Sequence, residues 1–253
     1  MRFCLILLSG FVLSFNSWGQ DLNLKGLSSS WIQNGKLSSK WTYNIHVLSV
    51  YNAESLKFEE KVFPKGHCHL IPQLVLNRKL NNNLLAGIGF ALSKHNIFGT
   101  KENEPRAIGQ LMYTQSVSKL KIIHRPRLEL RYPLNLKTNV RGNAAIGRYQ
   151  VGLNYPLGKN KGTGFYLSAS NEVFLYFKGA TNGPVSSKNG KLISENWSSA
   201  GLGYDFSNSR IEIGYDYQML VRNKKQDYRI FNLLQLTFQK SIHWADMENW
   251  WYH

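Results

Sequence analysis

Arginine and carboxylate side chains recur at alternate positions in several segments of this 253-residue chain. In residues 122–132 these charged side chains all have odd numbers, so an extended strand would present them on one face. Neighbouring strands of this kind can pair opposite charges in a structural network. They can also line a small polar pore or a cavity for a solute, and such a solute would be anionic because arginines outnumber carboxylates. The charged set predicted to line an inner face is Arg125, Arg127, Glu129, Arg131, Arg148, Glu172, Arg210, Glu212 and Asp216.

Patterns for catalysis or metal binding are weaker. His67 and His69 would share one face of a strand with Cys68 on the other, which leaves a metal site without enough ligands. The chain lacks a G-x-S-x-G nucleophile elbow. We therefore predict no catalytic residue, metal or cofactor, and keep a lipid-modifying barrel enzyme as the alternative. Its candidate general bases are His46, His67, His69, His95, His124 and His243.

The composition restricts the class of protein. Apolar residues make up 43% of the chain and aromatic residues 13%, which is enough for a packed or lipid-covered structure. Only two cysteines occur, Cys4 and Cys68, so a disulfide-stapled fold is excluded. The 31 Lys and Arg exceed the 15 Asp and Glu, but the excess is spread over predicted connections. Lipid and a small anionic solute are the expected partners, and nucleic acid is not.

The first residues have the layout of a secretory signal. A positive start at Arg2 precedes an apolar stretch that is shorter than the ~20 residues of a membrane-spanning helix. Ser17 and Gly19 occupy the small-residue positions that precede a cleavage site. The predicted divisions are a signal peptide at 1–19, cleaved after Gly19, one barrel domain over 20–253, and a tail at 241–253 that is a candidate extension outside the barrel.

Downstream of this leader, apolar and polar residues alternate over long stretches. Strict alternation over eight or more residues predicts strands, and ten residues tilted by ~40° cover roughly 25 Å, the height of the apolar band of an outer-membrane barrel. We predict a transmembrane antiparallel up-and-down β-barrel in the outer membrane of a Gram-negative bacterium. The alternative is a soluble periplasmic barrel with its apolar face inward. The predicted aromatic girdles contain Trp41, Tyr51, Tyr132, Tyr155, Phe165 and Phe177.

Short and long connections alternate along the sequence, as they do when one rim of a barrel carries turns and the other carries loops. The pattern delimits about eleven segments. Since bacterial single-chain barrels have an even number of strands, we predict ten or twelve. The predicted short turns are near 34–39, 79–83, 118–120, 156–163 and 207–209, and the longer loops are 52–66, 94–106, 133–141, 178–195 and 222–227.

Several of these segments resemble a bacterial family of unknown function, DUF2490. The resemblance rests on the R-x-R-x-E-x-R strand at 125–131, on the strand 148–157, on the N-E-x-F element at 171–174, and on the hairpin segments 201–204 and 212–215. It covers most of residues 25–240 and implies an outer-membrane β-barrel without an assigned activity. One departure is Asn196-Trp197, where the family pattern leads us to expect Asn-Arg.

Overall fold

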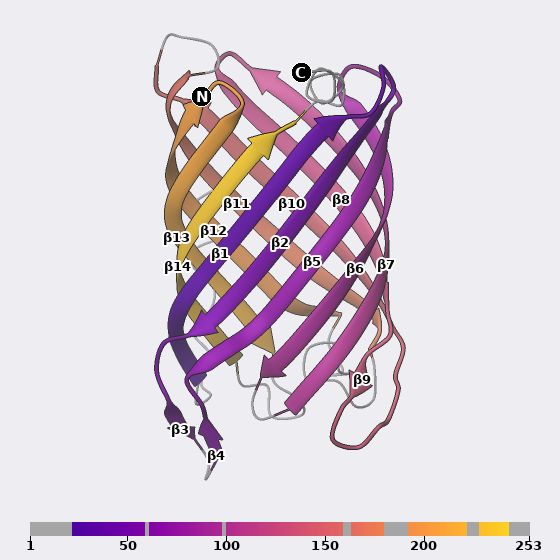
Figure 1. The fold of residues 1–253 in the computed structure, drawn as a ribbon, viewed down its shortest axis with the longest axis vertical. Coiled ribbons are helices and arrows are strands. Elements are labelled where there is room, and N and C mark those ends of the chain that lie inside the picture. The colour runs from indigo at the N-terminus through magenta and orange to yellow at the C-terminus, as the bar shows by residue number, and fades with distance from the viewer. Residues whose placement is uncertain are drawn as a thin grey trace, which may run out of the picture.

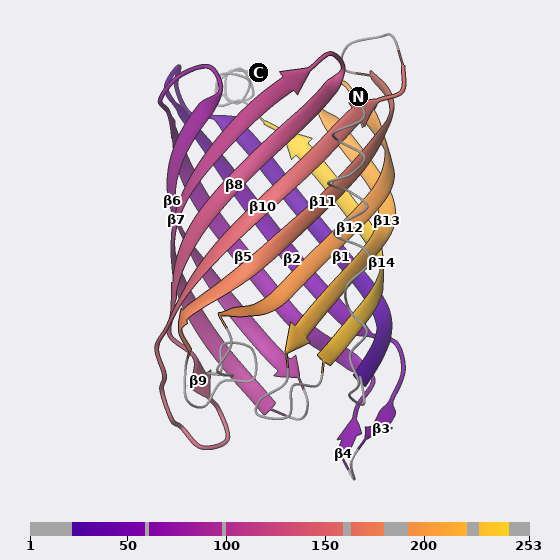
Figure 2. The ribbon, with the colours of Figure 1, turned by 180° about the vertical axis from the view of Figure 1, so that it is seen from behind.

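The computed structural model describes residues 22–58, 61–97, 100–158, 163–179, 192–221 and 228–242. Within these ranges eleven strands form a closed barrel, because β6 pairs with β7 as well as with β5 (Figures 1 and 2). The strands of the wall are β1 (Leu22–Lys36), β2 (Trp41–Asn52), β5 (Gly66–Lys79), β6 (Leu84–Ile97), β7 (Thr100–Val117), β8 (Leu120–Arg131), β10 (Ala144–Pro156), β11 (Thr163–Lys178), β12 (Ile193–Phe206), β13 (Ser209–Val221) and β14 (Tyr228–Ser241).

The eleven strands correct the predicted count of ten or twelve. Each segment delimited by the connections is present as a strand, and the error came from imposing an even number. Because consecutive strands run in opposite directions, an odd number leaves the first and last strands running the same way. β1 and β14 therefore meet as a parallel pair, in register from Leu22 opposite Arg229 to Asn34 opposite Ser241.

The two rims of the barrel differ. At one rim, β5 is joined to β6, β7 to β8 and β12 to β13 by a few residues each. At the other rim lie the hairpin of β3 (Leu56–Phe58) and β4 (Lys61–Phe63), and the short strand β9 (Leu134–Asn135) (Figure 1). We call these ends the short-turn rim and the long-loop rim. The predicted loop at 94–106 is wrong, since β6 continues to Ile97 and β7 begins at Thr100.

The two faces of the wall have opposite chemistry. The outer face exposes large apolar side chains, among them Ile88 at 71% and Phe90 at 52%. The inner face carries fully buried charges such as Glu129 and Arg131. In water this arrangement would be unfavourable, because a continuous apolar belt would be solvated while charges were buried. The wall is therefore built for a lipid environment, and the alternative of a soluble barrel with an inward apolar face is wrong.

In the described ranges, no helix has the length and apolar character needed to cross a membrane. The predicted signal peptide at 1–19 lies outside these ranges, as do residues 243–253 of the predicted tail, including His243. Those features of the sequence stay predictions. Ser241, the first residue of the predicted tail, is the last residue of β14.

Candidate functional site

The lumen of the barrel has two halves with different contents. Beside the long-loop rim the inward side chains are buried against one another, and we call this the packed half. Toward the short-turn rim the inward side chains surround a cavity of about 390 Å³, and we call this the open half. The packed half contains an apolar cluster of Leu22, Leu24, Val50, Phe63, Cys68, Leu220, Phe231 and Leu233, and an ionic network of Glu104, Arg106, Arg127, Glu129, Arg131, Arg148 and Glu172.

Glu129 on β8 is the centre of the ionic network. Its carboxylate oxygens lie 2.6 Å from Arg148 Nη1 and 2.7 Å from Arg131 Nη2. Arg127 and Arg106 lie farther off, at 3.4 and 3.7 Å. Four guanidinium groups thus surround one buried carboxylate, which offsets part of the cost of removing these charges from water. Arg127 also donates to Gln73 on β5, so the network crosses the lumen.

Arg148 on β10 lies at the border between the two halves. Its Nε and Nη2 donate to the two oxygens of Glu172 at 3.0 and 2.6 Å, a bidentate pair between adjacent strands. Its guanidinium also lies 4.4 Å from the ring centroid of Phe174 and 5.8 Å from that of Trp197. Trp197 replaces the arginine expected from the family pattern, so this position supplies a cation–π contact in place of another charge.

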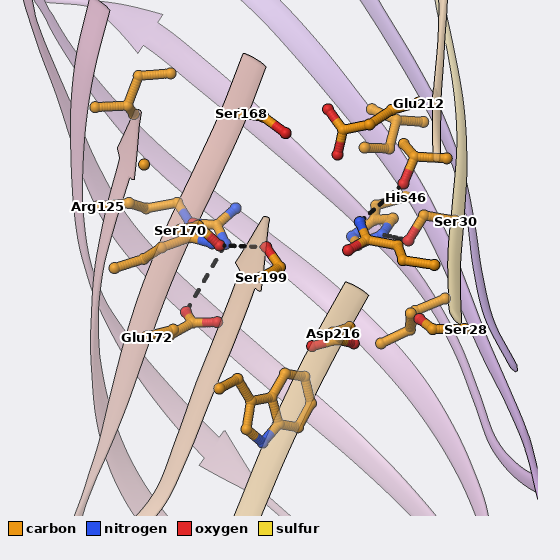
Figure 3. A pocket seen from close by; sticks show the side chains of 18 of the residues that line it. Ser28, Ser30, His46, Arg125, Ser168, Ser170, Glu172, Ser199, Glu212 and Asp216 are labelled. Atoms are coloured by element: carbon orange, nitrogen blue, oxygen red, sulfur yellow. Dashed lines mark hydrogen bonds and ion pairs between the residues drawn. The ribbon is translucent and has the colours of Figure 1, made fainter. Parts of the chain in front are cut away.

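The cavity of the open half is lined by polar side chains from most strands of the wall (Figure 3). Its lining extends to Arg210 and Gln239, close to the short-turn rim. Because the packed half fills the other end of the lumen, a solute would enter from the short-turn rim. Five arginines line the cavity against three carboxylates: Arg106, Arg125, Arg127, Arg148 and Arg210, with Glu172, Glu212 and Asp216.

Arg125 on β8 is the arginine of this cavity with the weakest pairing to a carboxylate. Its Nη2 lies 3.8 Å from Glu172 Oε1, and its side chain is 24% exposed. Its Nε is buried and has no hydrogen-bond partner among the described residues. A buried donor without a partner is unfavourable unless a solvent molecule or a ligand accepts from it. Arg125 is therefore suited to hold an anion in the cavity.

Neutral polar groups and small residues complete the cavity. Ser170 Oγ and Ser199 Oγ are 2.9 Å apart, and Ser30 Oγ lies 3.2 Å from His46 Nε2 (Figure 3). Gly203 allows a close approach near the short-turn rim, since a Cβ atom there would overlap the ring of Tyr166. The Arg210 guanidinium lies over the ring of Tyr166, with its Cζ atom 4.2 Å from the ring centroid.

All nine charged residues predicted to line the lumen come from strands of the wall, and they divide between the two halves. Arg125, Arg127, Glu129, Arg131, Arg148 and Glu172 are brought together around Glu129 and Glu172. The other three line the cavity, which Arg125, Arg127, Arg148 and Glu172 also border, so only Glu129 and Arg131 lie entirely in the packed half. Arg210 forms a bidentate pair with Asp205, and Asp216 accepts a hydrogen bond from Gln218 at 2.8 Å.

The six aromatic residues predicted as girdles are distributed between the two rims. Trp41, Tyr155 and Phe165 lie at strand ends beside the short-turn rim, and all three are exposed. Tyr132 and Phe177 are exposed beside the long-loop rim, where Tyr51 lies against the edge of the His67 ring. This arrangement resembles the aromatic belts of membrane barrels.

One group of interior residues is absent from the set predicted to line the lumen. Glu102, Glu104 and Arg106 are buried in the lumen at the start of β7, within the segment predicted as a loop. The charges at alternate positions 102, 104 and 106 are the feature of the sequence that could have indicated a strand with these side chains on one face. No apolar residue alternates with them, since Lys101, Asn103 and Pro105 are the outward positions, so the segment does not look like a membrane strand.

The structure also corrects the arrangement predicted for His67, Cys68 and His69. A bulge opposite Val50 and Tyr51 makes Cys68 the extra residue of β5. His69 is therefore buried in the lumen while His67 is exposed, and they do not share a face. His69 Nδ1 lies 2.7 Å from His95 Nδ1 on the next strand.

A closed barrel with an apolar outer face and a charged interior is a transmembrane β-barrel. Residues 29–229 match the family described as "Protein of unknown function (DUF2490)", and the chain belongs to that family.

Solved structures with a similar fold include LpxR from Salmonella typhimurium, at 9% identity and a TM-score of 0.46, with 78% of this chain and 83% of that chain covered. A NanC porin is similar at 14% identity and a TM-score of 0.47, with 81% and 94% covered. No curated protein matches the sequence.

Proposed function

We propose that this protein is an outer-membrane barrel of a Gram-negative bacterium whose lumen binds a small anionic solute that enters from the short-turn rim. The leader-like residues 1–19 support export, and the apolar outer face supports membrane insertion. The cavity volume of about 390 Å³ is within the ~300–1,000 Å³ range of small-molecule sites. Its excess of arginines over carboxylates favours a negatively charged ligand.

The observation that carries this proposal is the state of Arg125. The other arginines of the ionic network are held by carboxylates at 2.6–2.8 Å or by amide oxygens at 2.9 Å. Arg127 also has an Nε without a hydrogen-bond partner among the described residues, but both of its Nη atoms donate to amide oxygens. Arg125, in contrast, is partly exposed to the cavity, has an unpartnered Nε, and lies 3.8 Å from its carboxylate partner. A phosphate, sulfate or carboxylate group would accept from this guanidinium and would replace the solvent in the cavity.

Binding is favoured over free passage by the packed half. Glu104, Glu129, Arg131 and the apolar residues Val50, Phe231 and Leu233 are almost completely buried. Side chains in a water-filled channel would remain accessible to solvent. We therefore expect no steady ion conductance when the purified protein is inserted into a planar bilayer.

Inorganic phosphate is a suitable first probe, and Trp197 is a reporter within the cavity lining. Titration of the detergent-solubilised protein with phosphate should change its tryptophan fluorescence, and Trp197→Phe should remove that change. Arg125→Gln should weaken phosphate binding at least about tenfold, since a hydrogen bond to a charged group contributes about 1.5–3 kcal/mol. Arg78→Gln makes the same change of charge at an exposed position and should have no effect. Equal phosphate affinity in both variants would contradict the proposal.

The alternative of a lipid-modifying enzyme has one specific observation in its favour. The contact between Ser30 and His46 places a nucleophile beside a base. Both groups face the lumen, however, whereas lipid chains lie on the outer face of the wall. Phospholipid or lipid A hydrolysis by the purified protein that is abolished by Ser30→Ala would overturn the binding role.

The location is tested separately. We expect the protein in the outer-membrane fraction, as a folded band that shifts on boiling, with a mature chain that begins at Gln20. Recovery as a soluble periplasmic protein would contradict the assignment.

A further inference from the structure

A second polar cluster lies in the packed half, at the corner where β6 and β7 meet beside the long-loop rim. His95 on β6 and Glu102 and Glu104 on β7 are all buried, at 2%, 1% and 0% exposed. One ligand atom from each of the three side chains lies within 4.8 Å of the others. These residues do not line the cavity of the open half.

Pairing of the strands produces this cluster. His95 lies opposite Glu102 across the β6–β7 pair, and Ser93 lies opposite Glu104. On the other side of β6, His69 lies opposite His95. Glu102 also lies opposite Asn135 of β9, a short strand of the long-loop rim. Four neighbouring strands therefore fix its position.

Glu102 is the residue that points to a ligand. Both of its carboxylate oxygens are buried and neither has a hydrogen-bond partner among the described residues. An isolated buried carboxylate is highly unfavourable, and proteins pair such groups, protonate them or coordinate them to metals. The Oγ of Ser93 is likewise buried without a partner in this part of the structure. Arg106 and Arg131 form ion pairs with Glu104 and Glu129, and Arg106 Nη2 also lies 3.2 Å from His95 Nε2.

We propose that His95, Glu102 and Glu104 bind a divalent first-row transition metal ion, with Zn²⁺ as the representative case. Imidazole nitrogen together with carboxylate oxygen favours such an ion over Ca²⁺ or Mg²⁺, which take oxygen ligands alone. In tetrahedral geometry, ligand atoms at 2.0–2.2 Å from one ion lie about 3.3–3.6 Å apart. Ligand atoms separated by up to 4.8 Å must therefore converge by up to about 1.5 Å when the ion binds.

Neighbouring groups would orient these ligands. Arg106 Nε donates to Glu104 Oε1 at 2.7 Å and fixes that carboxylate. The contact between the Nδ1 atoms of His69 and His95 fixes the ring of His95. Hydrogen bonds of this kind to the ligating residues are a regular feature of protein metal sites. The positive charge of Arg106 opposes a cation, and its Nη2 would have to move away from His95 Nε2 when the ion binds. The carboxylate of Glu102, which has no hydrogen-bond partner among the described residues, would supply a negative charge to the ion.

The test uses chelator-treated, full-length protein in detergent micelles, without a polyhistidine tag, titrated calorimetrically with Zn²⁺. We expect one ion to bind per chain and Glu102→Gln to weaken binding at least tenfold. Bound Zn²⁺ should raise the temperature at which the folded band is lost on a gel, and the variant should lose this shift. Glu102→Gln should itself fold, because glutamine has nearly the same shape and replaces a buried carboxyl group that has no hydrogen-bond partner among the described residues.

Glu195→Gln is the matched control. Glu195 is also a buried carboxylate of the lumen with one unpartnered oxygen, but it accepts from the Tyr176 hydroxyl and lies outside the cluster. This variant should bind Zn²⁺ like the unaltered protein. The proposal is overturned if the protein binds no Zn²⁺, if Glu102→Gln binds it equally well, or if removal of the exposed His67 accounts for the binding. Equal affinity for Ca²⁺ would also overturn the choice of ion.

Discussion

The packed and open halves of the lumen are enclosed by the same strands but have different physical properties. In the packed half, Glu129 and Arg131 are buried and each charge is held by several partners. In the open half, Arg125 and Arg210 are partly exposed and have one carboxylate partner each. The wall therefore does not determine whether the lumen is filled. The inward side chains of each strand segment determine whether the part of the lumen beside that segment is filled.

This difference separates stability from binding. The packed half combines apolar burial with a balanced ionic network, and it blocks the long-loop end of the lumen. The open half leaves room for a solute beside an arginine that is incompletely paired. Substitutions in the first region should mainly change the free energy of unfolding, and substitutions in the second should mainly change ligand affinity.

The largest expected effect is that of Glu129→Gln. The substitution removes the carboxylate that four arginines share, and breaking a buried ion pair typically costs about 3–5 kcal/mol. We expect a loss of this size in the free energy of unfolding, measured by urea titration in detergent micelles. Glu212→Gln makes the same chemical change in the open half and should cost less than about 1 kcal/mol. Equal costs for the two variants would contradict the division of the lumen.

A pair of isoleucines gives the next largest difference. Ile146 is fully buried in the packed half beside Phe174 and Tyr176, and Ile32 lines the cavity. Ile146→Ala should cost about 3 kcal/mol, because it leaves a cavity that its neighbours cannot fill. Ile32→Ala should cost about 1 kcal/mol or less, since its side chain already borders open space. The same urea titrations measure both, and a larger cost at Ile32 would show that the cavity is closed in solution.

Much of this structure is predictable from local sequence pattern. The parity of Arg125 to Arg131 assigns those charges to one face because successive side chains of a strand alternate. The eleven segments follow from their connections, although the assumption of an even count and the loop predicted at 94–106 were wrong. The start of β7 was missed because Glu102 and Glu104 lie where the outward positions are polar, so the apolar half of the membrane-strand pattern is absent there.

The contents of the lumen could not be predicted in the same way. Arg127 donates to Gln73, which is 54 positions away in the sequence and on another part of the wall. His69, His95 and Glu102 come together only because β5, β6 and β7 have a particular register, which a bulge at Val50 and Tyr51 modifies. A pattern within one strand contains no information about the residue that it meets across a barrel.

Two serines give a smaller effect that sharpens the comparison. Ser93 is fully buried opposite Glu104, and Ser170 lines the cavity. Ser93→Leu should cost about 2 kcal/mol, because extra atoms in a packed region force strain. Ser170→Leu should change the free energy of unfolding by less than about 0.5 kcal/mol. It should nevertheless weaken phosphate binding, since it fills part of the cavity. Unchanged phosphate affinity in Ser170→Leu would place the anion elsewhere.

The smallest expected effect lies beside the short-turn rim, where Arg210 pairs with Asp205. Both side chains are about a quarter exposed, at 29% and 24%, so solvent and salt weaken their attraction. A double-mutant cycle with Arg210→Gln and Asp205→Asn should give a coupling free energy of about 0–1 kcal/mol that declines from low to high salt. The coupling between Arg131 and Glu129 should be larger and nearly independent of salt, because that pair is buried. A rim coupling that is large and insensitive to salt would mean that the open half is shielded from solvent, and entry of a solute from this rim would then be contradicted.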